Sequence, residues 1–207
     1  MTDWGAVTGP LLRRWESVLP GSPGLGAELL ARWSEPHRHY HDLRHLAETV
    51  EALDLLGPSD RLEEIALWFH DAIHTNAPGE DEQRSATLAA RALPVAGLGT
   101  AETSEVVRLV LVTVDHRPAP ADRTGARVSD ADLAVLAADP DRYRASVRAL
   151  RAESPQLDEP AWRAARLAAL AGFAALQPLF HSPLGNARWE ARARANLAAE
   201  RAEQAAG

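Results

Sequence analysis

The chain has 207 residues and a formal net charge of −7, from 22 basic and 29 acidic side chains, and every basic residue is an arginine. An acidic chain without a long basic run disfavours nucleic-acid binding, because such binding depends on neutralising phosphates. Cysteine is absent. Disulfides and thiolate metal sites are therefore excluded, and any metal ion must be held by histidine, carboxylate or water.

The apolar fraction of 46% is ordinary for a globular protein, and the length suits a single domain. The first residues lack the basic segment and apolar core of a secretory signal. No apolar run approaches the roughly 18 residues of a membrane helix. We therefore expect a cytoplasmic protein that does not enter a membrane. The composition does not indicate the oligomeric state of the protein.

Alanine, leucine, arginine and glutamate dominate the chain, and these are good helix formers. Glycine and proline punctuate the gaps at 20–24, 57–59, 77–79 and 117–125. The pattern predicts an all-α fold, compact and without an internal repeat. The predicted helices cover about residues 3–19, 24–34, 41–56, 60–74, 81–92, 102–116, 130–137, 140–152, 159–180 and 185–204.

The run LVLVTV at 109–114 is the only strongly β-like segment. It lies inside TSEVVRLVLVTVDH at 103–116, where Thr103 or Ser104 could cap a helix. Apolar residues then recur at helical spacing. We therefore interpret this segment as a buried helix.

Seven of the eight histidines lie between residues 37 and 116. His41 and His45 are four residues apart and would share one face of the predicted 41–56 helix. The predicted 60–74 helix is apolar up to Phe69 and then reaches His70 and Asp71. Burying an imidazole and a carboxylate without a partner is costly, and a metal ion would satisfy both.

A further acidic helix start, SDADL at 129–133, adds carboxylates to this set. Nitrogen and oxygen ligands without sulfur suit hard or borderline divalent ions rather than Cu(I) or an iron–sulfur cluster. The sequence therefore predicts one or two divalent ions, drawn from Mn, Mg, Zn, Ni and Fe.

Three segments in this order, YHDLRHLAETV (40–50), LWFHDAIH (67–74) and SDADLAVL (129–136), resemble the H…HD…D signature of the HD superfamily of metal-dependent phosphohydrolases. The first is also similar to the Tyr-His-Asn-x-x-His-Ala motif of the cyclic-nucleotide phosphodiesterases. The resemblance covers residues 30–200, including ARWEARARANLAAE at 187–200, and is to bacterial HD proteins of about this length. It implies one HD-type domain over 1–207, with a core at about 30–150 and a C-terminal helical extension at about 155–204.

The resemblance also implies a role for each matching residue. The implied metal ligands are His45, His70, Asp71 and Asp132, with Asp71 able to bridge two ions and Asp130 as the alternative to Asp132. The implied catalytic residues are His41, which would protonate the leaving oxygen, and Asp71. Candidates for a second metal ion or for supporting the first ligands are His74, Glu82, Asp130 and His116.

The sequence departs from the family pattern where Asp42 and Asp81 replace asparagines and His74 replaces a tyrosine. The two acids would add negative charge near the site. Arg38 and Arg84 flank the motifs. We expect them to bind substrate phosphate, because a guanidinium binds phosphate oxygens in a bidentate way.

Together these features predict a metal-dependent phosphohydrolase acting on a small phosphoester or nucleotide, in which metal-activated water attacks phosphorus. Its partner would be a small phosphorylated substrate.

Three alternatives remain at the level of sequence. One is an HD-type di-iron oxygenase, which His74 and the extra acids could support. Another is a zinc peptidase, because His41-Asp42-x-x-His45 mimics His-Glu-x-x-His, although this leaves His70 and Asp71 unexplained. The third is a non-catalytic nucleotide-binding module with the same fold.

Overall fold

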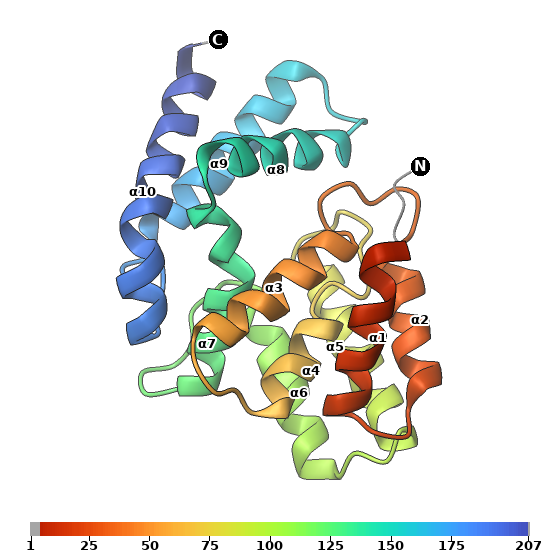
Figure 1. Cartoon of the computed structure of the whole chain (residues 1–207). Helices are drawn as coiled ribbons and strands as arrows, with labels where there is room; N and C mark the ends of the chain where they lie inside the picture. Colours follow the sequence, from red (N-terminus) through yellow and green to blue (C-terminus); the bar gives the residue numbers. More distant parts are fainter. Residues whose placement is uncertain (1–4, 207) are drawn as a thin grey trace.

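A computed structural model describes residues 5–206, without the side chain of the last of these, and within this range the chain is helical with no strand. The predicted all-α fold is confirmed. The predicted helix start at residue 3 lies outside the described residues. The elements are α1 (Gly5–Val18), α2 (Pro23–Trp33), α3 (Leu43–Leu55), α4 (Arg61–Phe69), α5 (Glu80–Val95), α6 (Thr100–Val112), α7 (Arg123–Leu133), the 3₁₀ helix η1 (Ala134–Ala137), α8 (Pro140–Ala152), α9 (Glu159–Ala175) and α10 (Pro183–Ala206) (Figure 1).

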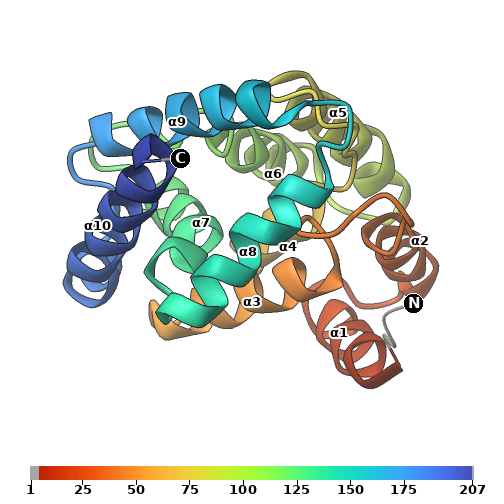
Figure 2. The ribbon, with the colours of Figure 1, turned by 90° about the horizontal axis from the view of Figure 1, so that it is seen from above.

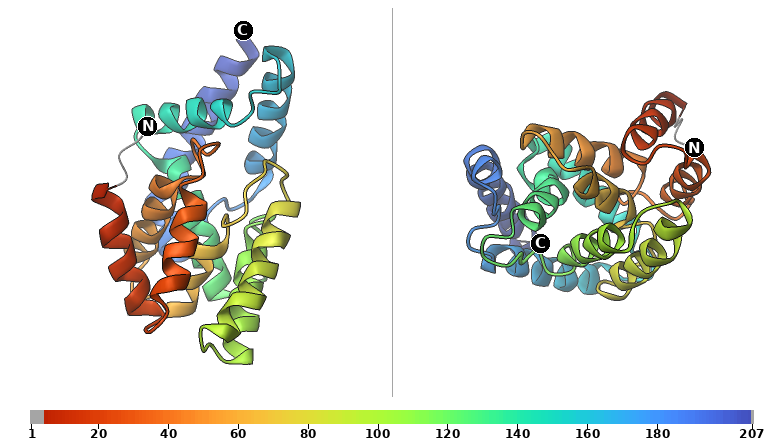
Figure 3. Two further views of the ribbon diagram at one scale, coloured as in Figure 1. Left: turned by 90° about the vertical axis from the view of Figure 1, so that its right-hand side faces the viewer. Right: turned by 90° about the horizontal axis from the view of Figure 1, so that it is seen from below.

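Helices α1 to α7 share one apolar core. Trp15, Trp33, Trp68 and Phe69 are fully buried in it, and the rings of Trp15 and Trp68 pack with their centroids 5.0 Å apart. Large aromatic side chains supply much apolar burial per residue. They join α4 to α1 and α2, which lie side by side at the edge of the bundle (Figure 3), while α3, α4 and α7 pack against one another.

The valine-rich segment forms α6, as predicted, with Val106, Leu109 and Val110 fully buried. Helix α6 ends at Val112 rather than near residue 116. Beyond its end the backbone turns, and His116 adopts a positive φ of 54°. His116 is therefore presented by a turn and not by a helix.

Three other predicted boundaries were wrong, and one of them is the end of α9, which lies at Ala175 rather than at residue 180. Helix α4 ends at Phe69 rather than at residue 74, and the backbone carbonyls of Asp71 and Ala72 accept hydrogen bonds from the buried guanidinium of Arg38. Helix α7 begins at Arg123, not near 130, because Asp122 caps it by accepting from the Gly125 N–H. Gly125 allows this contact, since a Cβ there would lie 2.2 Å from Asp122 Oδ2.

A second apolar core begins at Leu133 and joins η1, α8, α9 and α10. A buried ion pair crosses it: Arg166 of α9 donates to both oxygens of Glu200 in α10 at 2.7 and 2.9 Å. The two cores thus divide the chain near residue 133, and α1 and α2 belong to the first of them. Seen from above, α8 and α9 run across the end of the first bundle (Figure 2).

None of the helices within residues 5–206 is long and apolar enough to cross a lipid bilayer.

Candidate metal centre and active site

Three helices of the first core bring nitrogen and carboxylate ligands to one point. His45 lies in the first turn of α3, His70 and Asp71 follow the last residue of α4, and Asp132 lies in the last turn of α7. His45 Nε2 is 3.0 Å and His70 Nε2 is 3.4 Å from the same oxygen, Asp132 Oδ1. Asp71 Oδ2 is 3.1 Å from His70 Nε2 and 3.7 Å from His45 Nε2.

The tautomer of His70 is set by the backbone. Its Nδ1 lies 2.7 Å from the carbonyl oxygen of Leu67, which can only accept, so Nδ1 carries a proton and donates it. In the neutral ring the Nε2 lone pair then faces the carboxylates and the Nε2 of His45, 3.3 Å away. Two imidazole nitrogens and two carboxylates that converge in a buried site require a cation between them, either a proton or a metal ion.

The electrostatics agree with this geometry. Burial disfavours the imidazolium, yet the neighbouring Asp71 and Asp132 raise the pKa of His70 well above its ordinary value. Burial likewise disfavours the carboxylates, but His70 and His45 hold the pKa of Asp132 well below its usual range. The site therefore has a strong affinity for positive charge. The donor set of His45, His70 and Asp132, with Asp71 beside it, fits a divalent ion such as Mn, Fe, Zn or Ni.

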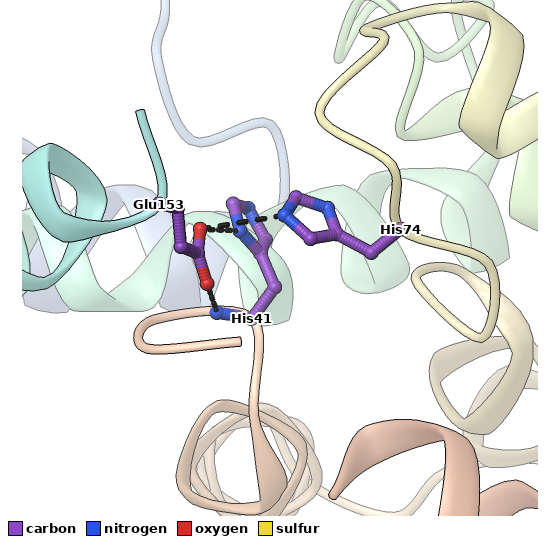
Figure 4. Close-up of side chains that lie close together, drawn as sticks. All are labelled: His41, His74 and Glu153. Atoms are coloured by element: carbon purple, nitrogen blue, oxygen red, sulfur yellow. Dashed lines mark hydrogen bonds and ion pairs between the residues drawn. The ribbon is translucent and has the colours of Figure 1, made fainter. Parts of the chain in front are cut away.

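A second cluster consists of His41, His74 and Glu153 (Figure 4). It lies beside the first, since the ring centroids of His41 and His45 are 5.9 Å apart. Glu153 Oε1 accepts hydrogen bonds from three consecutive backbone N–H groups, those of residues 39–41, at 2.7, 2.8 and 2.9 Å. Its other oxygen accepts from His41 Nδ1 at 2.7 Å. His74 Nε2 lies 3.4 Å from that same oxygen and has no hydrogen-bond partner.

Glu153 is the carboxylate that orients His41. Burial alone would raise its pKa, but the hydrogen bonds from His41 and the backbone, together with the nearby His74, hold the pKa of Glu153 well below its usual range. An ionised carboxylate only accepts, so Nδ1 of His41 must donate to it. Nε2 of His41 has no hydrogen-bond partner among residues 5–206, and His41 lines the cavity.

Sequence reasoning did not find Glu153. Glu153 directly follows α8, whose alanine- and arginine-rich sequence gives no sign of a functional residue. It also lies 112 residues from His41 in the chain. Sequence reasoning expected Asp42 to add negative charge near the site. In the structure, Asp42 caps α3 by accepting from the N–H groups of Arg44 and His45.

His41 itself is not on a helix, contrary to the predicted 41–56 helix, because α3 begins at Leu43. His41 and His45 therefore do not share a helix face, and each belongs to a different cluster. This removes the basis of the zinc-peptidase reading, which requires two histidines one helical turn apart on the same helix.

No family model, curated protein or solved structure matches the chain.

The two arginines expected to bind substrate are engaged elsewhere. The Arg38 side chain is fully buried, and its guanidinium donates to the backbone oxygens of His41, Asp71 and Ala72, which ties the segment before α3 to the end of α4. Arg84 is exposed and pairs with Glu80 at 3.2 Å. Neither lines the cavity above the metal ligands. The structure therefore does not bring them together with the candidate metal ligands, and phosphate binding by either arginine stays a prediction.

The remaining candidates fall at different places around the ligands. His116 Nε2 is 3.8 Å from Asp132 Oδ2, while its Nδ1 is 3.2 Å from the Ser129 hydroxyl. Burial lowers the pKa of His116. Glu82 lines the same cavity and accepts from the Gly79 N–H. Burial, with a smaller contribution from Asp71, raises the pKa of Glu82.

The structure separates Asp130 from the metal ligands. Asp130 is fully buried and accepts from the N–H groups of His181 at 2.7 Å and Ser182 at 2.8 Å, at the entry to α10. Gly185 permits this approach, because a Cβ there would lie 2.3 Å from Asp130 Oδ2. Asp130 therefore joins the two cores, and only Asp132 of this pair lies with His45 and His70.

We accordingly expect Asp130→Ala to lower the free energy of unfolding by about 3 kcal/mol, because two buried N–H groups lose a charged acceptor. Its metal content should stay that of the parent chain. Urea denaturation and elemental analysis of the folded variant measure both quantities. A folded Asp130→Ala protein that has lost its metal would show that this carboxylate is a ligand.

Proposed function

We propose that the chain is a metal-dependent phosphohydrolase of the HD type, in which His45, His70, Asp71 and Asp132 hold the metal ion. The observation that carries the proposal is the convergence of two imidazole Nε2 atoms and Asp132 Oδ1 within 3.0 to 3.4 Å of one another. The HD resemblance of the three motifs supports it independently, because the implied ligands are the ones that lie together.

The site opens into a cavity of about 510 Å³, within the range of small-molecule pockets. His41, His45, Asp71 and Asp132 all line it, so a bound substrate reaches the ligands and the proton donor together. A divalent ion bound here supplies a water of lowered pKa and neutralises charge on the phosphoryl oxygens.

His41 is the proton donor in this proposal. Glu153 accepts a hydrogen bond from its Nδ1, and His41 lines the cavity, so Nε2 is the ring nitrogen left for the leaving oxygen. In hydrolysis, water adds to phosphorus, the ester P–O bond breaks, and the leaving oxygen takes the proton from His41 Nε2. Glu153 also accepts from the backbone N–H groups of residues 39–41. It therefore positions both the main chain and the imidazole ring of His41.

One observation favours a second candidate function. The second cluster also holds two imidazoles and a carboxylate, and the rings of His41 and His45 lie with centroids 5.9 Å apart. If both clusters bound iron, the site would suit a di-iron oxygenase. The 2.7 Å hydrogen bond from His41 Nδ1 to Glu153 satisfies both atoms without an ion, which favours the hydrolase.

Turnover of phosphoesters tests the proposal. We expect the metal-free protein, prepared with a chelator, to be inactive towards 4-nitrophenyl phosphate and to regain activity on addition of Mn²⁺, Ni²⁺ or Mg²⁺. Asp130→Ala is the matched control, and its metal-free form should regain activity on addition of the same ions. Iron-dependent oxygen consumption without phosphate release would indicate the di-iron oxygenase instead. Substrate binding without turnover in the presence of any of these metals would indicate a non-catalytic binding module.

A further inference from the structure

The cavity above the metal ligands has two chemically different sides. The ligand side comes from α3, the end of α4 and α7 and carries the histidines and acids. The opposite side comes from η1, α8 and α9. We call its apolar side chains the apolar wall. The wall consists of Leu136, Leu150, Ala169, Phe173 and Leu176.

The polar side chains next to the apolar wall are engaged within the protein. The Ser146 hydroxyl donates to the Tyr143 carbonyl oxygen at 2.7 Å, and the Thr113 hydroxyl donates to that of Val110 at 2.9 Å. Arg166 is neutralised by its two hydrogen bonds to Glu200. The two hydroxyl protons and the charge of Arg166 are therefore not available to a sugar, an amine or a second phosphate on this side of the cavity.

The free polar groups lie elsewhere. Arg117 lines the cavity, is exposed, and its guanidinium has no partner among residues 5–206. Asp115 is exposed beside it and accepts the backbone N–H of Arg117. The one cavity-lining cation left unpaired in the described chain is thus at the solvent edge. A single arginine there can meet one phosphoryl group as it enters but does not suit a polyphosphate chain.

We propose that the substrate is a phosphate ester with an uncharged, apolar leaving group, aryl or branched alkyl, that packs on the apolar wall while its phosphoryl group meets the metal ligands. This inference rests on the proposed function and narrows it, because it excludes nucleotides and sugar phosphates. Burial of apolar surface favours such a group, and polar groups of a sugar would lose their hydration without gaining partners.

The test compares two phosphonates, which bind like phosphate esters but cannot be hydrolysed. Isothermal titration calorimetry of the Mn²⁺-loaded full chain should give a Kd for benzylphosphonate about 10-fold or more below that for 2-hydroxyethylphosphonate, as expected for burial of an aromatic ring. Phe173→Ala should remove most of this preference and leave the Kd of 2-hydroxyethylphosphonate unchanged. Leu184→Ala, an exposed leucine outside this cavity, is the matched control and should behave like the parent chain.

Equal affinity for the two phosphonates, tighter binding of the hydroxyethyl compound, or failure of both to bind would overturn the inference. A preference for benzylphosphonate that persists in Phe173→Ala would place the ring away from the apolar wall and overturn it as well. The calorimetry measures binding without hydrolysis, so it is independent of the proposed activity. If the protein prefers benzylphosphonate but hydrolyses no phosphate ester, the role of the apolar wall in binding stands and the proposed hydrolase activity is refuted.

Discussion

Asp132→Asn is expected to lower kcat/KM for 4-nitrophenyl phosphate by about 10³-fold or more, the loss of ~4 kcal/mol of transition-state stabilisation. The reason is that Asp132 Oδ1 is the oxygen that both His45 Nε2 and His70 Nε2 approach. An amide keeps the shape but removes the negative charge that offsets a divalent ion. Steady-state kinetics at saturating Mn²⁺ measure the effect.

The variant should remain folded, because Asp132 accepts no backbone hydrogen bond within residues 5–206, unlike its neighbour Asp130. Circular dichroism and the denaturation midpoint check this. A folded Asp132→Asn enzyme with activity within a few-fold of the parent chain would contradict the assignment of Asp132 as a ligand.

Glu153→Gln is expected to lower kcat by about 10²-fold for alkyl phosphates and much less for 4-nitrophenyl phosphate. The glutamine oxygen can still accept from the backbone N–H groups of residues 39–41, so the loop is kept. Its amide nitrogen, however, faces His41 Nδ1 and no longer stabilises the imidazolium. A poor leaving group needs the proton from His41, whereas 4-nitrophenolate leaves without it.

Glu190→Gln is the control for this variant, because Glu190 also accepts backbone N–H groups, those of Leu179 and Phe180, but lies outside the cavity. It should leave both substrates unaffected. An equal loss on both substrates in Glu153→Gln would indicate a purely structural role. Loss of a metal ion from Glu153→Gln would show instead that His41, His74 and Glu153 form a second metal site.

Much of the fold followed from local pattern. The helical spacing of apolar residues placed α2 and α8 well, and capping or turn residues marked their gaps. The start of α7 was missed because Pro118, Pro120 and Gly125 indicate a loop, whereas Asp122 caps a helix that contains Gly125. The end of α4 was missed because Arg38, which is distant in sequence, donates hydrogen bonds to the carbonyl oxygens of Asp71 and Ala72. In a longer helix these oxygens would accept from N–H groups of the next turn.

The candidate ligands could be predicted because each lies in a short motif with a recognisable order, and the structure brings His45, His70 and Asp132 together. The residues that surround these candidate ligands could not be predicted from the sequence. Glu153 and the apolar wall come from helices whose sequences carry no chemical signal, and only long-range packing places them over the site. Arg38 stands next to a motif, yet its burial makes it a structural cation.

The most direct measurement is elemental analysis of the full chain purified without chelator, alongside Asp132→Asn and Asp130→Ala. The proposed centre predicts at least one divalent ion per chain in the parent protein and in Asp130→Ala, and its loss from Asp132→Asn. No bound metal in the parent chain, even after incubation with Mn²⁺, Ni²⁺, Zn²⁺ and Fe²⁺, or equal metal in all three proteins, would contradict the centre.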